Sequence, residues 1–150
     1  MGNNLKPIGV IDSGVGGLSM VFALDQLLPS EEIVYVADPL HFPYGEKNKN
    51  ELIPIVSSLI SFLTESLKVK LIITACGTIS SNFLEELSTL FQVPFIGIID
   101  PASNDALKKT KTGKVVVLAT SATIKSGTFR KHIQKINSAI TVKEEAWPEF

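Results

Sequence analysis

Five short segments carry the residues whose side chains could take part in acid–base or nucleophilic chemistry. They combine carboxylates, hydroxyls, glycines and the single thiol of the chain, and each follows a run of apolar residues: Asp12-Ser13-Gly14-Val15-Gly16-Gly17, Asp38 with Pro43-Tyr44-Gly45, Cys76-Gly77-Thr78, Asp100-Pro101 and Thr120-Ser121-Ala122-Thr123. In open parallel sheets, ligands bind outside the carboxyl ends of the strands. We therefore expect these segments to gather at one edge of a sheet and to form a site for a small polar molecule.

Cys76 is the strongest catalytic candidate among these residues. A free cysteine is often only a small buried apolar residue, but this one ends an apolar run and precedes a helix expected to begin near Thr78 or Ile79. Amide groups at a helix start favour the thiolate and lower the pKa of a thiol. Gly77 would let a ligand approach the backbone, and Thr78 adds a hydroxyl donor. The segment predicts a reactive thiol, with a structural cysteine as the alternative.

The turn from Gly14 to Gly17 lies between a predicted strand and a predicted helix, where backbone amides could hold a phosphate or a carboxylate. It is not a P-loop, because no Gly-Lys-Ser/Thr follows, and it departs from the dinucleotide fingerprint, because Ser19 occupies the third small position. Asp38 keeps a weak dinucleotide hypothesis open as a ribose-binding carboxylate. Asp12 is either a cap for the following helix or a carboxylate that assists proton transfer.

The two histidines and the last hydroxyl segment are weaker candidates. His41 lies in the irregular stretch 38–50 and could reach the site, whereas His132 is expected on a solvated helix face. Neither histidine belongs to a cluster with metal-ligand spacing, so no metal site is predicted. Thr120 and Thr123 either bind a carboxylate at the start of a helix or cap that helix.

The elements that must position these residues follow from the apolar pattern. Continuous apolar runs, typical of strands buried on both faces of a parallel sheet, lie at 8–11, 33–37, 71–75, 95–99 and 115–119, with a weaker one at 141–146. Helical periodicity lies between them at 18–28, 52–67, 83–91, 102–109 and 121–136. Pro54 is expected in the first turn of its helix, and Gly127 weakens the last one. The alternation predicts an α/β fold with a mainly parallel open sheet, helices on both faces and a single domain over residues 1–150.

Composition excludes several classes of function. The 150 residues carry 14 basic and 15 acidic side chains, and a formal net charge of −1 provides no field to attract nucleic acid or an anionic membrane. Mean hydropathy is high at +0.27, but no apolar run approaches the ~18 residues of a spanning helix. Met1–Pro7 shows no secretory signal, and one cysteine excludes an internal disulfide and a multi-cysteine zinc site. These observations predict a soluble, cytoplasmic domain.

In order along the chain, the motifs resemble those of bacterial glutamate racemases. Ile8–Leu18 is similar to the family's first motif, Pro43-Tyr44-Gly45 to its Pro-Tyr-Gly loop and Ala75-Cys76-Gly77-Thr78 to its Ala-Cys-Asn-Thr motif, while Pro94–Pro101 and Thr120–Ser126 are similar to two further segments. The resemblance implies a flavodoxin-like lobe of the Asp/Glu racemase fold. It also implies an isomerase that interconverts L- and D-glutamate without a cofactor and supplies D-glutamate for peptidoglycan, cell wall biogenesis and cell shape.

In that family one cysteine thiolate removes the α-proton of glutamate and a second thiol returns a proton on the opposite face, as inversion of a stereocentre requires. The resemblance implies that Cys76 is a catalytic thiol and that Asp12 is its acid–base helper. It implies substrate contacts at Asp12, Ser13, Tyr44, Gly45, Gly77, Thr78, Thr120 and Thr123. The partner implied is a small amino acid, glutamate, and a homo-oligomer stays open.

The chain departs from the family pattern in four places. Gly77 replaces an asparagine, His41 and its neighbours stand where an arginine usually precedes the Pro-Tyr-Gly loop, and Trp147 stands where the family usually has Ala-Cys-Pro. The chain stops at Phe150, before the Cys-Thr-His motif that holds the second thiol. We therefore expect a truncated or incomplete form, the N-terminal racemase lobe alone. Another racemase of the superfamily and an inactive carboxylate-binding domain stay open as alternatives.

Overall fold

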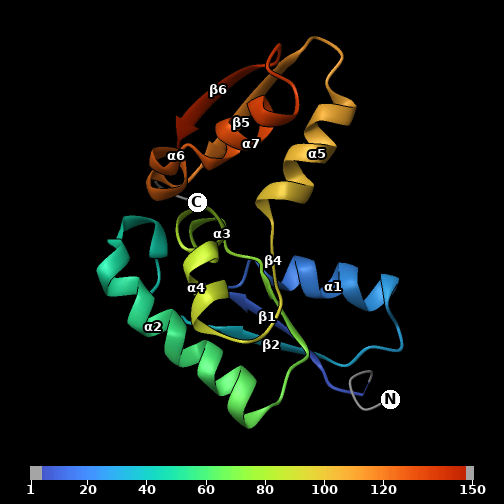
Figure 1. Ribbon diagram of the computed structural model, residues 1–150, viewed down its shortest axis with the longest axis vertical. Helices are drawn as coiled ribbons and strands as arrows, with labels where there is room; N and C mark the ends of the chain where they lie inside the picture. Colours follow the sequence, from blue (N-terminus) through green and yellow to red (C-terminus); the bar gives the residue numbers. More distant parts are fainter. Residues whose placement is uncertain (1–4, 148–150) are drawn as a thin grey trace.

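The computed structural model describes residues 5–147, so residues 1–4 of the Met1–Pro7 stretch and residues 148–150, including Phe150, lie outside it. The strands of the described residues form two parallel sheets, one with the order β2-β1-β3-β4 and one with β5 beside β6. Figure 1 shows these sheets at opposite ends of an elongated molecule. The predicted α/β class with a mainly parallel open sheet is confirmed, but the strands divide between two sheets. The single domain over residues 1–150 stays a prediction.

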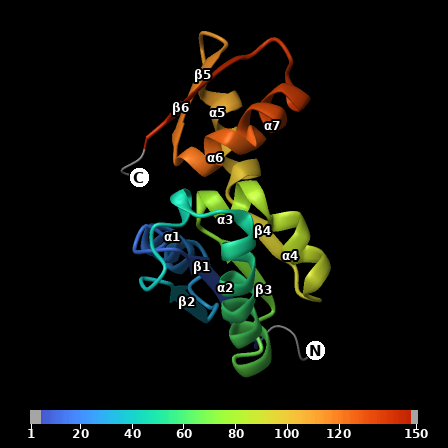
Figure 2. The same ribbon diagram turned by 90° about the vertical axis from the view of Figure 1, so that its left-hand side faces the viewer.

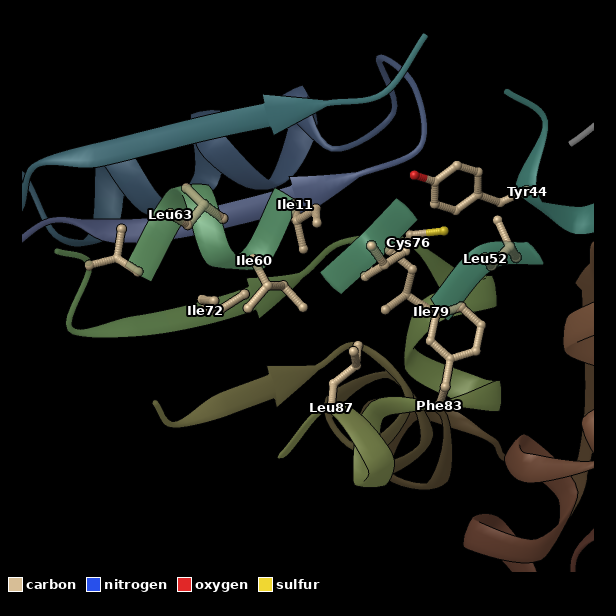
Figure 3. Packing of buried hydrophobic residues seen from close by; sticks show 12 residues of the cluster. Ile11, Tyr44, Leu52, Ile60, Leu63, Ile72, Cys76, Ile79, Phe83 and Leu87 are labelled. Atoms are coloured by element: carbon tan, nitrogen blue, oxygen red, sulfur yellow. The ribbon is translucent and has the colours of Figure 1, made fainter. Parts of the chain in front are cut away.

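The four-stranded sheet is covered by helices on both faces. Its strands are β1 (Ile8–Asp12), β2 (Ile33–Ala37), β3 (Leu71–Thr74) and β4 (Phe95–Gly97). The helices around it are α1 (Leu18–Leu27), α2 (Lys49–Ser61), α3 (Gly77–Asn82) and α4 (Leu84–Leu90). Residues of α1 pack against Val10 and Ile73 on one face. On the other face α2 and α4 pack against Ile11 and Ile72, and Figure 3 shows this second cluster. Helices therefore lie on both faces of this sheet, as is typical of parallel strands.

The helix α2 begins before the apolar pattern predicts. The Asn48 side chain accepts a hydrogen bond from the Glu51 amide, and the Glu51 carboxylate accepts one from the Asn48 amide, so a reciprocal capping box sets the start. Pro54 consequently lies inside the helix, and its expected place in the first turn is wrong. The apolar residues mark only the buried face of a helix, whereas its first residues here are polar. A π-helical turn, η2 (Phe62–Ser66), continues the helix.

In the described part of the chain, helices cover the second sheet on one face. It consists of β5 (Lys114–Ala119) and β6 (Thr141–Ala146), and it packs against α5 (Ile99–Lys109), α6 (Ser121–Ser126) and α7 (Thr128–Ile136). Val117 and Val142 point into a small cluster around Ile133. The alternate residues of β5 face away from it, and Val116 and Leu118 are 59% and 48% exposed.

Two boundaries near the second sheet differ from those expected. The predicted helix 121–136 is two helices, because Gly127 adopts a left-handed conformation with φ 61° between α6 and α7. The predicted strand 95–99 ends at Gly97, and α5 begins at Ile99, before the predicted 102. Asp100 consequently lies in the first turn of α5 rather than at the end of a strand. No helix of residues 5–147 is long and apolar enough to cross a membrane.

Candidate active site

One cavity of about 490 Å³ lies where the carboxyl ends of β1 and β3 face the start of α6. All residues that the sequence proposed as catalytic or substrate-binding line it: Asp12, Ser13, Tyr44, Gly45, Cys76, Gly77, Thr78, Thr120 and Thr123. Figure 2 shows α3 below α6 at this junction of the two sheets. The fold therefore brings the proposed residues together, while their individual roles stay predictions. Asp38 and Asp100, which also follow predicted strands, do not line the cavity.

The Cys76 thiol lies at the end of β3, immediately before α3, and is 6% exposed. Its sulfur points towards Tyr44 at the edge of the apolar cluster in Figure 3, and it donates a long hydrogen bond of 3.7 Å to the Ser13 hydroxyl. Such a position leaves the sulfur at the boundary between the core and the cavity.

Burial raises the pKa of the Cys76 thiol. Hydrogen bonds that the backbone amides of Ile79 and Thr78 and the Ser13 hydroxyl donate to the thiolate form lower it, and the negative charge of Asp12 raises it. The net direction is upward. The amides at the start of α3 act as expected, but desolvation of the thiolate is the larger effect. The thiol is consequently the resting form near neutral pH.

Asp12 holds the glycine turn closed. Its Oδ2 atom accepts a hydrogen bond of 2.7 Å from the Gly17 amide, and Gly17 has no room for a side chain, since a Cβ atom there would lie 2.8 Å from the Asp12 Cβ and from the Tyr35 ring. The Tyr35 hydroxyl donates to the carbonyl of Gly14 on the same turn. The expected role of Asp12 as the cap of α1 is wrong, because Gly17 is the cap residue and no side chain caps that helix. Asp12 instead holds the turn before α1 and also lines the cavity. Tyr35 was not singled out, because an aromatic residue in a strand is ordinary for its position.

The loop after β2 is organised around the Asp38 carboxylate. Its Oδ2 atom accepts a hydrogen bond of 2.7 Å from the Tyr44 hydroxyl and lies 2.8 Å from Nδ1 of His41. Burial raises the pKa of Asp38, but the hydrogen bonds from Tyr44 and His41 outweigh that effect, and the pKa lies below its ordinary value. Burial and the contact with Asp38 raise the pKa of Tyr44. Because the Asp38 carboxylate is bound by residues of its own loop, the geometry does not support the hypothesis that it binds the ribose of a dinucleotide.

Hydroxyl groups join the two halves of the cavity. Thr120 Oγ1 lies 3.1 Å from Thr78 Oγ1 and 3.1 Å from Thr123 Oγ1, and it also accepts a hydrogen bond from the Thr123 amide as the cap of α6. The backbone of Gly45 packs closely against the same residue, since a Cβ atom at Gly45 would lie 2.5 Å from the Thr120 Cβ. Thr120 therefore caps a helix and forms the contact between the two sides of the cavity.

Several apolar residues that line the cavity were missed: Phe42, Ile98, Leu118 and Phe129. No sequence signal could have found them, because apolar residues are common and these come from separate elements. His132 is half-buried rather than solvated, and its Nδ1 atom pairs with Asp100 at 2.9 Å in a different cavity of about 690 Å³. Within residues 5–147, no cluster of three or more His, Cys, Asp or Glu side chains is suited to a metal ion.

Comparisons with known proteins agree with this arrangement. Curated glutamate racemases from Lactococcus lactis subsp. cremoris and Staphylococcus carnosus are 41% identical over 145 residues, which cover 97% of this chain and 53% and 54% of those relatives. The solved glutamate racemase from Aquifex pyrophilus superposes with a TM-score of 0.89 at 35% identity, over 96% of this chain and 56% of that one. A glutamate racemase isoform from Bacillus anthracis superposes with a TM-score of 0.90 at 34% identity, over 95% of this chain and 53% of that one.

The chain thus spans about half the length of the curated relatives that it matches. The sequence model of Asp/Glu/Hydantoin racemases matches residues 8–148, which is nearly the whole chain. With the Cys76 thiol, the Asp12 carboxylate and the hydroxyl contacts gathered around one cavity, sequence and structure give the same assignment. The chain belongs to the Asp/Glu/Hydantoin racemase family.

Proposed function

We propose that this chain forms one half of the active site of a glutamate racemase, which interconverts L- and D-glutamate by proton transfer at the α-carbon. The observation that carries the proposal is the position of Cys76, whose thiol stands at the inner wall of the cavity beside Ser13 and Asp12. In this proposal the Cys76 thiolate takes the α-proton of glutamate on one face, or the thiol returns a proton there in the reverse direction.

The remaining residues of the cavity have roles that follow from charge. Removing the α-proton places negative charge on the substrate, and hydrogen-bond donors aimed at that charge lower the barrier. Hydroxyls of Ser13, Thr78 and Thr120 line the cavity as donors of this kind. The negative charge of Asp12 raises the pKa of Cys76, which makes the thiolate a stronger base and so assists removal of the α-proton. Binding glutamate through Tyr44, Gly45, Gly77 and Thr123 completes the proposed half-site.

Full racemisation needs a second acid–base group on the opposite face of the substrate. Cys76 is the single cysteine of the sequence, so a second thiol has to come from outside these 150 residues. The relatives extend well beyond the part that matches this chain. We therefore propose exchange of the α-hydrogen, rather than inversion, as the reaction of the chain by itself.

The substrate and the cellular role are proposed from the relatives. The Francisella tularensis glutamate racemase was solved in complex with D-glutamate, and the Escherichia coli one with L-glutamate and the activator UDP-MurNAc-Ala. The Thermus thermophilus enzyme was solved with β-chloro-D-alanine, another small amino acid. These ligands support glutamate as the partner of this cavity. Supply of D-glutamate for peptidoglycan, in the cytoplasm, is the role that we propose with it.

One observation bears on the alternative that this racemase acts on a different amino acid. Gly77 stands in place of the family's asparagine, and a Cβ atom there would meet only the Thr123 hydroxyl at 3.5 Å, an ordinary contact. Position 77 therefore has room for a Cβ atom. Gly77→Asn should strengthen glutamate binding if glutamate is the substrate, and unchanged or weaker binding would favour another amino acid.

The decisive experiment follows the α-hydrogen of L-glutamate in heavy water with the purified chain. Proton NMR measures the loss of the α-signal, and chiral chromatography measures the configuration of the product. We expect slow exchange that accelerates at alkaline pH, because the pKa of Cys76 is raised, and we expect Cys76→Ala to abolish it. Exchange that persists in Cys76→Ala would refute the assignment of the thiol.

A binding measurement separates the inactive alternative. A ligand at 100 times its dissociation constant stabilises a fold by about 2.7 kcal/mol, which thermal unfolding detects. Stabilisation by glutamate with no exchange at any pH would favour a carboxylate-binding domain without the chemistry. Cys76→Ser is the matched control, because it keeps the shape of the cavity and a hydroxyl in place of the thiol.

A further inference from the structure

The loop after β2 holds three side chains in one hydrogen-bonded group behind the cavity wall. The Asp38 carboxylate accepts a hydrogen bond of 2.7 Å from the Tyr44 hydroxyl through Oδ2, while Nδ1 of His41 lies 2.8 Å from Oδ2 and 3.0 Å from Oδ1. The His41 amide also donates to Oδ1 at 3.3 Å. Tyr44 lines the cavity, but Asp38 and His41 do not. These two residues therefore act on the cavity only through Tyr44 and the loop.

The position of Tyr44 decides the shape of the cavity wall. Its side chain is 1% exposed and belongs to the same apolar cluster as Cys76, so the ring is held by packing and the hydroxyl by Asp38. The next residue, Gly45, packs closely against Thr120 at the opposite side of the cavity. A displacement of Tyr44 would thus change both the cover of the thiol and the contact with α6.

The Asp38 carboxylate in turn needs its donors. The residue is 6% exposed, and a buried carboxylate is costly unless hydrogen bonds compensate the loss of water. The Tyr44 hydroxyl and the ring and amide of His41 supply them. The His41 ring is 40% exposed, at the outer end of the group. It is therefore the member whose replacement disturbs the core least.

We propose that Asp38 and His41 are positioning residues: His41 orients the Asp38 carboxylate, and Asp38 holds Tyr44 and with it the wall that covers the Cys76 thiol. The inference deepens the proposed function, since the site that it shapes is the proposed glutamate site. Its geometry does not depend on which ligand binds there.

Three variants and one matched control test the proposal. His41→Leu removes the ring donor, His41→Asn restores an amide donor close to the position of Nδ1, and Tyr44→Phe removes only the hydroxyl. The control is His132→Leu, which breaks the other histidine–aspartate pair, His132 with Asp100 at 2.9 Å, away from this cavity. Urea unfolding of each variant accompanies the measurements and identifies any general loss of stability.

The first readout needs no ligand: the rate at which iodoacetamide alkylates Cys76 in the folded chain at fixed pH. We expect His41→Leu and Tyr44→Phe to raise this rate about tenfold, the effect of losing one hydrogen bond to a charged group. His41→Asn and His132→Leu should keep the wild-type rate. An unchanged rate in both His41→Leu and Tyr44→Phe would overturn the proposal. An equal rise in His132→Leu would also overturn it, because it would reflect general loosening.

The second readout is glutamate itself, by titration of the 15N-labelled chain and by α-hydrogen exchange. A positioning role predicts that His41→Leu weakens apparent affinity about tenfold, leaves the exchange rate at saturation nearly unchanged, and is rescued in His41→Asn. Equal affinity in wild type and His41→Leu would contradict the proposal. If the wild-type chain neither binds nor exchanges glutamate, the proposed function fails, and the alkylation rates still decide the positioning role.

Discussion

Strands β1 and β5 have similar apolar sequences but different surroundings. All five residues of β1 are buried, whereas in β5 only Val117 is. Within residues 5–147, β1 lies between two strands with helices on both faces, while β5 pairs only with β6 and has helices on one face. A continuous apolar run therefore indicates a strand whose residues could be buried on both faces. Whether they are buried depends on the strands and helices around it, which the sequence of the strand does not specify.

The difference has a consequence for the candidate site. One side of the cavity, with Asp12 and Cys76, belongs to the sheet that is covered on both faces. The other side contains Thr120 and Thr123 at the start of α6, which follows directly after the partly exposed strand β5. We expect the first side to be rigid and the second to depend on its contacts with Thr78 and Gly45.

The largest predicted effect comes from the same substitution in the two strands. Val10→Ala in β1, where the side chain is 0% exposed, should lower the free energy of unfolding by about 2–3 kcal/mol through lost burial and a residual cavity. Val116→Ala in β5, where it is 59% exposed, should change it by less than about 0.5 kcal/mol. Urea denaturation measures both. Similar losses in the two variants would mean that the exposed face of β5 is covered in solution.

The contact between the two sides of the cavity can be broken by one methyl group. Gly45→Ala places a Cβ atom 2.5 Å from that of Thr120, which requires a backbone shift that costs about 1–3 kcal/mol. We expect faster alkylation of Cys76 and weaker glutamate binding. Wild-type behaviour of Gly45→Ala would show that the second side does not rest on this contact.

Amide hydrogen exchange would sharpen the comparison along the backbone. Amides at the centre of β1 should exchange at least about tenfold more slowly than those of β5, because opening a central strand requires unfolding of the whole sheet. Mass spectrometry of peptides around Val10 and Val117 measures the two regions in one sample. Equal protection would contradict the view that the second sheet is the less stable part.

The smallest predicted effect is a shift in a pH profile. The pKa of Cys76 is raised above the ordinary 9.0, first by burial and also by the charge of Asp12. The alkylation rate should therefore keep increasing above that pH, and Asp12→Asn should move the profile to lower pH. Free energy of unfolding should fall over the same range, because the unfolded state loses the thiol proton first. A profile centred below 9.0 would show that burial does not control this thiol.

Parts of the fold were predictable because they depend on local pattern. Strand β2 has the predicted bounds, and the predicted alternation of strands and helices is present. The start of α2 was misplaced because the capping pair of Asn48 and Glu51 carries no apolar signal. Division of the strands into two sheets was not predictable either. The partner of β5 depends on which strands have an unpaired edge in the folded chain, and the residues of Val115–Ala119 carry no information about that.

For the site, the sequence by itself determined which residues to consider, because glycines, hydroxyls and one thiol placed directly after apolar runs are recognisable in a linear chain. Only the tertiary structure decided that Asp38 faces Tyr44 and His41 rather than the cavity. It also decided that the pKa of Cys76 is raised rather than lowered. The first outcome depends on how the loop after β2 folds, and the second depends on burial and on the contacts of Cys76 with the distant Asp12 and Ser13. These quantities exist only once the chain has folded.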